Sequence, residues 1–366
     1  MQRPPRAIVI HSPHSGRSSE LSQALTQLQT SGIEIDQAIP ISELDTLPPQ
    51  GANWQEHGAT LAIAAGGDGV VGGVITHIAE SDLPLGILPL GTANDIARSL
   101  RIPQDLHQAV AVIAQGREQA VDIGVAQPAE QAPHLASPTA RAPVLAHVHA
   151  QRQGFFAHAL AVGLNVQFAR IATNVVTRQR FGHLTYPLAA VEVLRNHEAL
   201  DVELLFEELF VPHTHPFTQP HQPASPAPVD QPIILRCHAL QVTVINAPIF
   251  GGQWQLAVPG ASLSDRLLDI VVIEEVEVGA LTAGLARLFG NGPQQPASPS
   301  NEQEYPSSLR AAELSGIPGI HHVQAQGVTI TTNADPRDVT LDGEVRGQTP
   351  IHVRMADKQL RVVVPQ

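Results

Sequence analysis

Short apolar runs alternate with amphipathic stretches through the first third of the chain. The apolar runs predict buried strands at residues 6–10, 60–65 and 83–91. Leucines spaced three and four apart predict a helix after the first strand, capped by Ser18 or Ser19 and stopped at Gly32. Further helical patterns follow the second and third strands. Strand, loop and helix repeated in this order are typical of a parallel α/β sheet.

The pattern changes after residues 121–126, where apolar segments separated by turn residues predict mostly strands. Such a series favours an antiparallel sandwich or barrel, with one helical stretch at 184–198. Pro-rich segments cannot bury enough apolar surface to fold alone, so we expect three surface excursions, at 127–143, 212–232 and 290–308. The second contains His213, His215 and His221, but no carboxylate or cysteine frames them, which favours a solvated loop over a metal site.

Composition narrows the class of protein further. The chain has 366 residues, enough for two domains of ordinary size, and 21 basic against 34 acidic residues. A net charge of −13 argues against a nucleic-acid partner, because such binding usually requires a basic face. The single cysteine, Cys237, excludes an internal disulfide and fits a reducing cytoplasm. The most apolar stretch, 155–169, is too short to span a bilayer, so we expect a soluble cytoplasmic protein that meets membranes only from outside.

The sequence GGDG, residues 66–69, follows the second predicted strand and opens a helix. Gly66, Gly67 and Gly69 allow the backbone to approach a phosphate, and the helix N-terminus adds partial positive charge. Asp68 would repel a bare phosphate, so it makes most sense beside Mg²⁺. An ordinary strand-to-helix turn with an aspartate cap is an equally good interpretation of these four residues alone.

A second polar loop, in PLGTAND, follows the third predicted strand. Thr92 and Asn94 can donate to phosphate and Asp95 can orient metal-bound water, while Gly91 begins the loop. An N-cap turn explains these residues equally well in isolation. Ligands of parallel sheets bind at the carboxyl ends of the strands, however, and both loops lie there. Far downstream, Asp342 and Glu344 flank Gly343 in LDGE, which by itself is typical of a hairpin turn.

Several segments together resemble the diacylglycerol kinase catalytic-domain family, which includes bacterial soluble lipid kinases and the sphingosine and ceramide kinases. The segments occur in the family's order and span nearly the whole chain: 66–69, 88–98, 121–124, 244–273 and 341–344. The resemblance implies an N-terminal parallel α/β domain, similar to that of NAD kinases and phosphofructokinases, followed by a C-terminal antiparallel β-sandwich that binds lipid. On this basis we expect the nucleotide-binding domain at 1–124, joined by 350–366, and the lipid-substrate domain at 125–349.

The resemblance also implies roles for particular residues. ATP would lie on the two glycine loops and on Ser15, which is kept in the N-terminal sequence HSPHSG. Glu344 matches the general base that activates the lipid hydroxyl, with Asp68 as the rival base. Asp265, together with carbonyl groups of Ser262 and Leu267, matches a structural Mg²⁺ site of bacterial members.

The chain departs from the family pattern at four positions. Val70 replaces a threonine, Gly72 an asparagine, Ser12 an asparagine and Arg266 a glycine. Each lost side-chain hydrogen bond to a charged group would weaken nucleotide binding by about 1.5–3 kcal/mol. The glycines, Asp68 and Glu344 remain.

The resulting hypothesis is an ATP-dependent lipid kinase that transfers the γ-phosphoryl group to a lipid hydroxyl. The alternatives are a non-catalytic nucleotide- or lipid-binding homologue, favoured only by the altered 70–73 segment, and an NAD kinase-like enzyme, which shares GGDG. Which lipid accepts the phosphoryl group stays open, as does the oligomeric state, a homodimer included. A basic segment at 169–186, with Arg170, Arg178 and Arg180, is either a solvated helix face or a peripheral contact with anionic headgroups.

Overall fold

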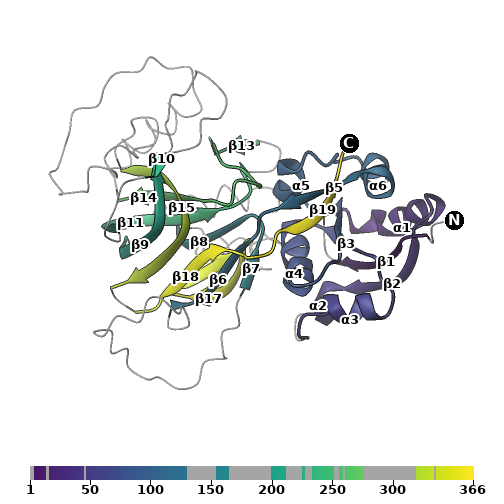
Figure 1. Ribbon diagram of the computed structural model, residues 1–366, viewed down its shortest axis with the longest axis horizontal. Coiled ribbons are helices and arrows are strands. Elements are labelled where there is room, and N and C mark those ends of the chain that lie inside the picture. The colour runs from purple at the N-terminus through teal and green to yellow at the C-terminus, as the bar shows by residue number, and fades with distance from the viewer. Residues whose placement is uncertain are drawn as a thin grey trace, which may run out of the picture.

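The chain forms two bodies of secondary structure that lie side by side, each built on its own sheet (Figure 1). The computed structural model describes residues 4–13, 16–44, 47–129, 154–164, 199–211, 225–226, 233–250, 255–258, 260–275, 319–333 and 335–366. The buried apolar side chains form two clusters, one around each sheet, and the first cluster also includes Val125 and Phe155 from strands of the second sheet. Within the described residues, no helix combines the length and apolar character needed to cross a membrane.

The first sheet has six strands in the order β2-β1-β3-β4-β19-β5. Strands β2, β1, β3, β4 and β19 run parallel, and β5 lies antiparallel to β19 at the edge. Their bounds are Arg6–His11 (β1), Glu34–Pro40 (β2), Leu61–Gly66 (β3), Leu85–Pro89 (β4), Arg117–Val121 (β5) and Leu360–Val364 (β19). The predicted parallel α/β architecture is therefore confirmed, and its central strand β3 is buried along its full length.

Helices connect these strands: Leu21–Thr30 (α1), Ile41–Leu44 (α2), Gly51–Glu56 (α3), Asp68–Ile78 (α4), Asp95–Ser99 (α5) and Leu106–Gln115 (α6). The expected cap of α1 was wrong. A 3-10 turn, Ser18–Glu20, precedes this helix, Glu20 is its N-cap, and no side chain bonds the cap position.

The second sheet is antiparallel and partly closed. Strand β9 pairs with both β11 and β15, and β14 lies between the latter two, so these four strands form a ring around the second core. Two arms extend from the ring, β8-β16-β17 from β11 and β18-β6-β7 from β15. The bounds are Gly124–Pro128 (β6), Gly154–Phe156 (β7), Ala159–Gly163 (β8), Leu200–Val211 (β9), Ile233–Ile245 (β11), Leu268–Glu274 (β14), Ile320–Thr332 (β15), Asp338–Leu341 (β16), Glu344–Gln348 (β17) and Ile351–Met355 (β18).

Three short strands complete the described part. Ser225–Pro226 (β10) pairs with β9, and Ile249–Phe250 (β12) pairs with Leu256–Ala257 (β13). The helical stretch expected at 184–198 lies outside the described residues, as do most of the three Pro-rich segments.

The chain crosses between the two bodies twice, and a hydrogen bond between side chains connects the two crossing segments. The first runs from β5 to β6, and the second from β18 to β19, the yellow strand that enters the parallel sheet in Figure 1. Asp122, fully buried in the first crossing, accepts hydrogen bonds from the Arg266 backbone N–H at 2.8 Å and from Gln359 Nε2 at 2.9 Å. Of the 350–366 segment, β18 lies in the second sheet and β19 in the first.

Candidate active site

Loops that follow β1, β3 and β4 meet at one edge of the parallel sheet, because these strands are neighbours and point the same way. Gly67 and Gly91 lie backbone to backbone: a Cβ on Gly91 would stand 2.3 Å from the Gly67 Cα. A Cβ on Gly16, in the first loop, would stand 3.2 Å from Thr92 Oγ1. The glycines of this edge are therefore required by the close approach of the loops.

The N-terminus of α4 opens beside these loops. Gly67 is its N-cap, and its carbonyl accepts the N–H groups of Val70 and Val71. The N–H groups of Asp68 and Gly69 lie in the first turn, where a helix has no internal acceptor for them. Residues 67–69 are partly exposed, so this end of an eleven-residue helix has the geometry of an anion site.

Asp68 joins the two glycine loops. Its Oδ1 accepts the backbone N–H of Ile96 at 2.9 Å, in the first turn of α5. The Asp68 side chain therefore caps α5, although α5 follows β4 and Asp68 follows β3. Asn94 is the N-cap residue of α5, but its side chain makes no capping hydrogen bond, so the expected cap by Asn94 was wrong. One carboxylate oxygen of Asp68 is used in this bond, and the other is available to a cation.

Asn94 stiffens the second loop from within. It adopts a left-handed backbone conformation with φ 55°, and its Oδ1 accepts the Gly91 N–H at 2.9 Å. Its Nδ2 donates to the Gly91 carbonyl at 3.0 Å and to Gln104 Oε1 at 2.9 Å. The side chain is buried and fully engaged with the loop, so its contribution to a ligand is to fix the backbone of Gly91 rather than to donate directly.

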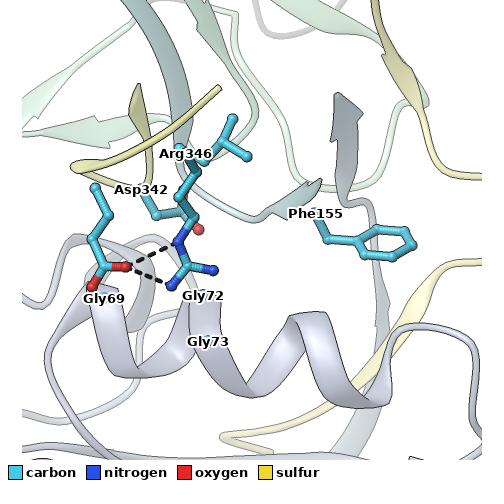
Figure 2. A pocket seen from close by; sticks show the side chains of 8 residues that line it. Gly69, Gly72, Gly73, Phe155, Asp342 and Arg346 are labelled. Atoms are coloured by element: carbon cyan, nitrogen blue, oxygen red, sulfur yellow. Dashed lines mark hydrogen bonds and ion pairs between the residues drawn. The ribbon is translucent and has the colours of Figure 1, made fainter. Parts of the chain in front are cut away.

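The β16–β17 hairpin brings the second body to this edge. Asp342 and Gly343 form its two-residue turn with φ of 48° and 86°, the left-handed pair typical of a type I′ turn. Glu344 starts β17 with a half-exposed side chain, and a Cβ on Gly69 would stand 3.1 Å from Glu344 Oε1. The hairpin and the helix N-terminus thus enclose a pocket (Figure 2), lined by Gly69, Gly72, Gly73, Phe155, Leu341, Asp342, Glu344 and Arg346.

Asp342 anchors the hairpin. Its Oδ2 accepts the N–H of Ala157 at 3.0 Å, and its Oδ1 accepts those of His158 at 2.9 Å and Ala159 at 3.1 Å. Burial raises the pKa of Asp342 above its ordinary value, although nearby His158 and the three N–H donors oppose this shift. The hairpin turn therefore holds an enclosed structural acid, not a solvated one, and the two acids of LDGE do not share an extended segment.

Gly72 is explained by the same carboxylate. A Cβ at this position would lie 2.7 Å from Asp342 Oδ2, so the space of a larger residue is taken by the hairpin. Val70 is buried and packs against Gly66, where a Cβ would lie 2.5 Å from its Cγ2. Both departures from the family pattern are thus accommodated by packing within the site.

Arg346 is the neighbour of Glu344 that the sequence reasoning missed. Its Nε and Nη2 both donate to Glu344 Oε2, at 2.9 and 2.5 Å. Figure 2 shows Arg346 reaching toward α4 beside Gly72, with these two bonds dashed. Strand alternation in the sequence could not have revealed this pair, because Arg346 is the extra residue of a β-bulge: Val345 pairs with Thr340 and Gly347 with Val339.

The residues expected to hold a structural Mg²⁺ lie outside this pocket. Asp265 Oδ1 accepts the N–H of Leu267 at 3.1 Å, and Ser262 Oγ lies 3.4 Å from Ser264 Oγ. The described residues contain no group of three or more His, Cys, Asp or Glu placed to hold a metal.

The electrostatics of this second location fit a hard cation. Asp265 as a whole residue is exposed, but its carboxyl group is partly desolvated, which raises the pKa of this carboxyl to about 6. The negative charges of Asp269 and Asp122 raise it further. Oxygen donors in an excess of negative charge suit Mg²⁺. Arg266, which takes the left-handed conformation at φ 63° where the family has glycine, donates to Asp122 Oδ1 at 3.3 Å and to the Ala356 carbonyl at 2.7 Å.

The structure thus gathers most of the expected residues at one edge. Gly66, Gly67, Asp68, Gly69, Gly91, Thr92, Asn94, Asp95 and Glu344 belong to the loops, helix ends and hairpin described above, whereas Ser262, Asp265 and Leu267 lie elsewhere. Ser15 lies outside the described residues, as does the basic segment 169–186.

The arrangement defines a two-domain protein in which the partly exposed N-terminus of α4, in a parallel α/β unit, faces a β-sandwich hairpin that carries Asp342 and Glu344. Comparisons with known proteins agree with this class. The family model of the diacylglycerol kinase catalytic domain matches residues 6–126, and that of the YegS C-terminal NAD kinase beta sandwich-like domain matches residues 159–293.

One curated relative extends the match to nearly the whole chain, and others match about a third of it. A diacylglycerol kinase of Staphylococcus saprophyticus subsp. saprophyticus is 38% identical over 365 residues, covering 98% of this chain and 95% of that protein. A diacylglycerol kinase of Staphylococcus aureus strain MRSA252 is 37% identical over 124 residues, 32% of this chain and 39% of that protein. The chain therefore belongs to the diacylglycerol kinase family.

The fold agrees as well. A solved diacylglycerol kinase structure from Bacillus anthracis str. Sterne superposes with a TM-score of 0.58 at 17% identity, covering 100% of this chain and 98% of that one. Another structure from the same organism gives a TM-score of 0.64 at 18% identity, covering 100% and 99%. At these identities the likeness concerns the fold alone, and it confirms the α/β domain followed by a β-sandwich domain.

Proposed function

We propose that this protein is an ATP-dependent lipid kinase that transfers the γ-phosphoryl group to a hydroxyl of diacylglycerol or a related lipid. The observation that supports this most strongly is the placement of Glu344 against Gly69, in the first turn of α4. A carboxylate beside an anion-binding helix end brings a proton acceptor next to the site for a phosphoryl group. Membership of the diacylglycerol kinase family supports the substrate class.

In this proposal the nucleotide phosphates bind the N–H groups at the start of α4 and the loop of Gly91 and Thr92. Gly67 and Gly91 have no side chains, which leaves the backbone donors accessible. Asp68 and Asn94 keep the two loops in register through their bonds to Ile96 and Gly91. Phosphoryl transfer depends chiefly on such positioning and on charge neutralisation.

Glu344 acts as the general base. Its carboxylate takes the proton of the lipid hydroxyl while the hydroxyl oxygen forms a bond to the γ-phosphorus and the bond between the β,γ-bridging oxygen and that phosphorus breaks, releasing ADP. The acceptor hydroxyl approaches Glu344 from the solvent side of the hairpin, where the Glu344 side chain is half-exposed. Asp342 holds the hairpin and is not the base, because its carboxylate is occupied by three N–H donors.

Mg²⁺ fits two places in this proposal. The free oxygen of Asp68 is suited to hold it beside the phosphates, where a metal ion neutralises charge during transfer. Asp265, with carbonyls of Ser262 and Leu267, is suited to a structural ion whose charge offsets that of the neighbouring Asp122 and Asp269. The lipid is reached at a membrane surface, which the basic segment 169–186 helps to contact.

The proposal is tested by incubating the full chain with γ-labelled ATP, MgCl₂ and mixed micelles of single lipids, followed by thin-layer separation. Diacylglycerol, ceramide, sphingosine and phosphatidylglycerol form the panel. Label in the phosphorylated form of any of them supports a lipid kinase and identifies its acceptor. Tight ATP binding without label in any lipid would instead indicate a non-catalytic homologue, and label in NAD added in parallel would indicate an NAD kinase.

A further inference from the structure

Arg346 holds one half of the Glu344 carboxylate. Both hydrogen bonds between the two side chains, from Arg346 Nε at 2.9 Å and Nη2 at 2.5 Å, end on Glu344 Oε2. The other oxygen, Oε1, is the atom nearest the Gly69 Cβ position, at 3.1 Å. The two oxygens of one carboxylate therefore have separate surroundings, a guanidinium on one side and the first turn of α4 on the other.

This orientation follows from the hairpin. The Asp342–Gly343 turn starts β17 at Glu344, and Arg346 is the extra residue of a β-bulge in the hairpin, because Val345 pairs with Thr340 and Gly347 with Val339. From this unpaired position the Arg346 side chain turns back to Glu344, as its two bonds show. The Glu344 side chain is 53% exposed and that of Arg346 31%. A glutamate this exposed would sample several rotamers unless a partner selects one.

The positive charge of Arg346 lies beside the acidic side chains of the pocket. Among the eight residues that line the pocket, Asp342 and Glu344 are acidic and Arg346 is the one basic residue. A carboxylate beside bound phosphates is repelled by them, and a guanidinium on its outer oxygen offsets that repulsion.

We infer that Arg346 is a positioning residue: it fixes Glu344 through Oε2 and presents Oε1, as the proton-accepting atom, to the lipid hydroxyl at the start of α4. This inference rests on the proposed function, because it specifies how the base of that reaction is held. Arg346 acts through Glu344 and does not itself contact substrate.

The test measures steady-state kinetics of the full chain with Mg-ATP and mixed micelles of the lipid acceptor. Arg346→Met should lower kcat by about 10²-fold, the effect usual for a misplacement of about 1 Å, with the KM for ATP and lipid unchanged within about twofold. Arg346→Lys should recover part of the loss, since an ammonium supplies the charge but not the two-donor fork. The matched control is Arg354→Met, because Arg354 has a side chain 32% exposed and pairs with Asp357 away from the pocket.

A double-mutant comparison separates positioning from direct contact. In the Glu344→Gln background, Arg346→Met should cause little further loss, because the carboxylate through which it acts is already gone. An equal loss in both backgrounds, a raised KM at constant kcat, or full activity of Arg346→Met would each overturn the inference while leaving a lipid kinase in place. A wild-type protein that labels no lipid would overturn the proposed function, and this inference with it.

Discussion

Replacing Gly91 by alanine tests whether the two glycine loops form the nucleotide site. The added Cβ would lie 2.3 Å from the Gly67 Cα, 2.7 Å from Asn94 Oδ1 and 2.9 Å from the Gly67 nitrogen. Two of these atoms belong to the backbone, so the loops must separate by about 1 Å to restore ordinary contact. Overpacking of this kind destabilises by about 1–3 kcal/mol, and the shifted donors should weaken ATP binding at least about tenfold, or 1.4 kcal/mol.

The assay is isothermal titration of Mg-ATP, with thermal unfolding recorded for each variant. Gly67→Ala provides a graded comparison, because its Cβ would lie 3.2 Å from the Gly91 Cα and needs a shift of only a few tenths of an ångström. Gly347→Ala is the control, since its Cβ would lie 3.4 Å from Ile351 Cδ1, an ordinary contact. The reasoning would be refuted if Gly91→Ala bound ATP as tightly as the Gly347→Ala control.

Three further outcomes are expected. Arg266→Gly relieves a left-handed backbone conformation but removes the guanidinium bonds to buried Asp122 and to the Ala356 carbonyl. The free energy of unfolding, measured in urea, should therefore fall by about 1–2 kcal/mol. An unchanged value would argue against a stabilising link between the two crossings. The pKa of Asp265 is about 6 in the folded chain against an ordinary value of 3.8, so this residue lowers stability as pH rises from about 4 to about 6. Asp265→Asn should remove this decline, which solvent screening keeps small. In the absence of ATP, the same change should also abolish thermal stabilisation by Mg²⁺ at the Asp265 site. Charge reversal at Arg178 and Arg180 should weaken binding to anionic vesicles, measured by sedimentation, by about 1 kcal/mol per residue. Binding that changes neither with salt nor with charge reversal would argue against a peripheral electrostatic contact.

The parallel sheet could be predicted because its strands are buried on both faces and appear as continuous apolar runs. β2 escaped prediction for the opposite reason: it is an edge strand with mostly partly exposed positions and lacks such a run. The glycine loops were identified correctly as a meeting point, since the carboxyl ends of neighbouring parallel strands must lie together.

The parts that escaped prediction depend on contacts between distant segments. Asp68 capping α5 and Asp342 binding the N–H groups of residues 157–159 join positions far apart in the chain, and no local spacing reveals them. Gly72 looked like a lost ligand in the sequence, whereas the structure shows that the Asp342 carboxylate occupies its side-chain space. The hydrophobic pattern along the chain predicted most helices and strands. The hydrogen-bond partners of the polar side chains could be identified only from the folded structure.

The central claim, that Glu344 is the base of a phosphoryl transfer from ATP to lipid, is tested most directly by comparing Glu344→Gln with Asp68→Asn. Both changes remove one charge and keep an oxygen acceptor, and in Asp68→Asn that oxygen can still accept the Ile96 N–H. Glu344→Gln should retain Mg-ATP affinity and lose about 10²–10⁴-fold in turnover of label into lipid, whereas Asp68→Asn should lose Mg²⁺-dependent ATP binding. Near-full turnover of Glu344→Gln, with Asp68→Asn inactive yet binding Mg-ATP normally, would contradict the account and assign the base to Asp68.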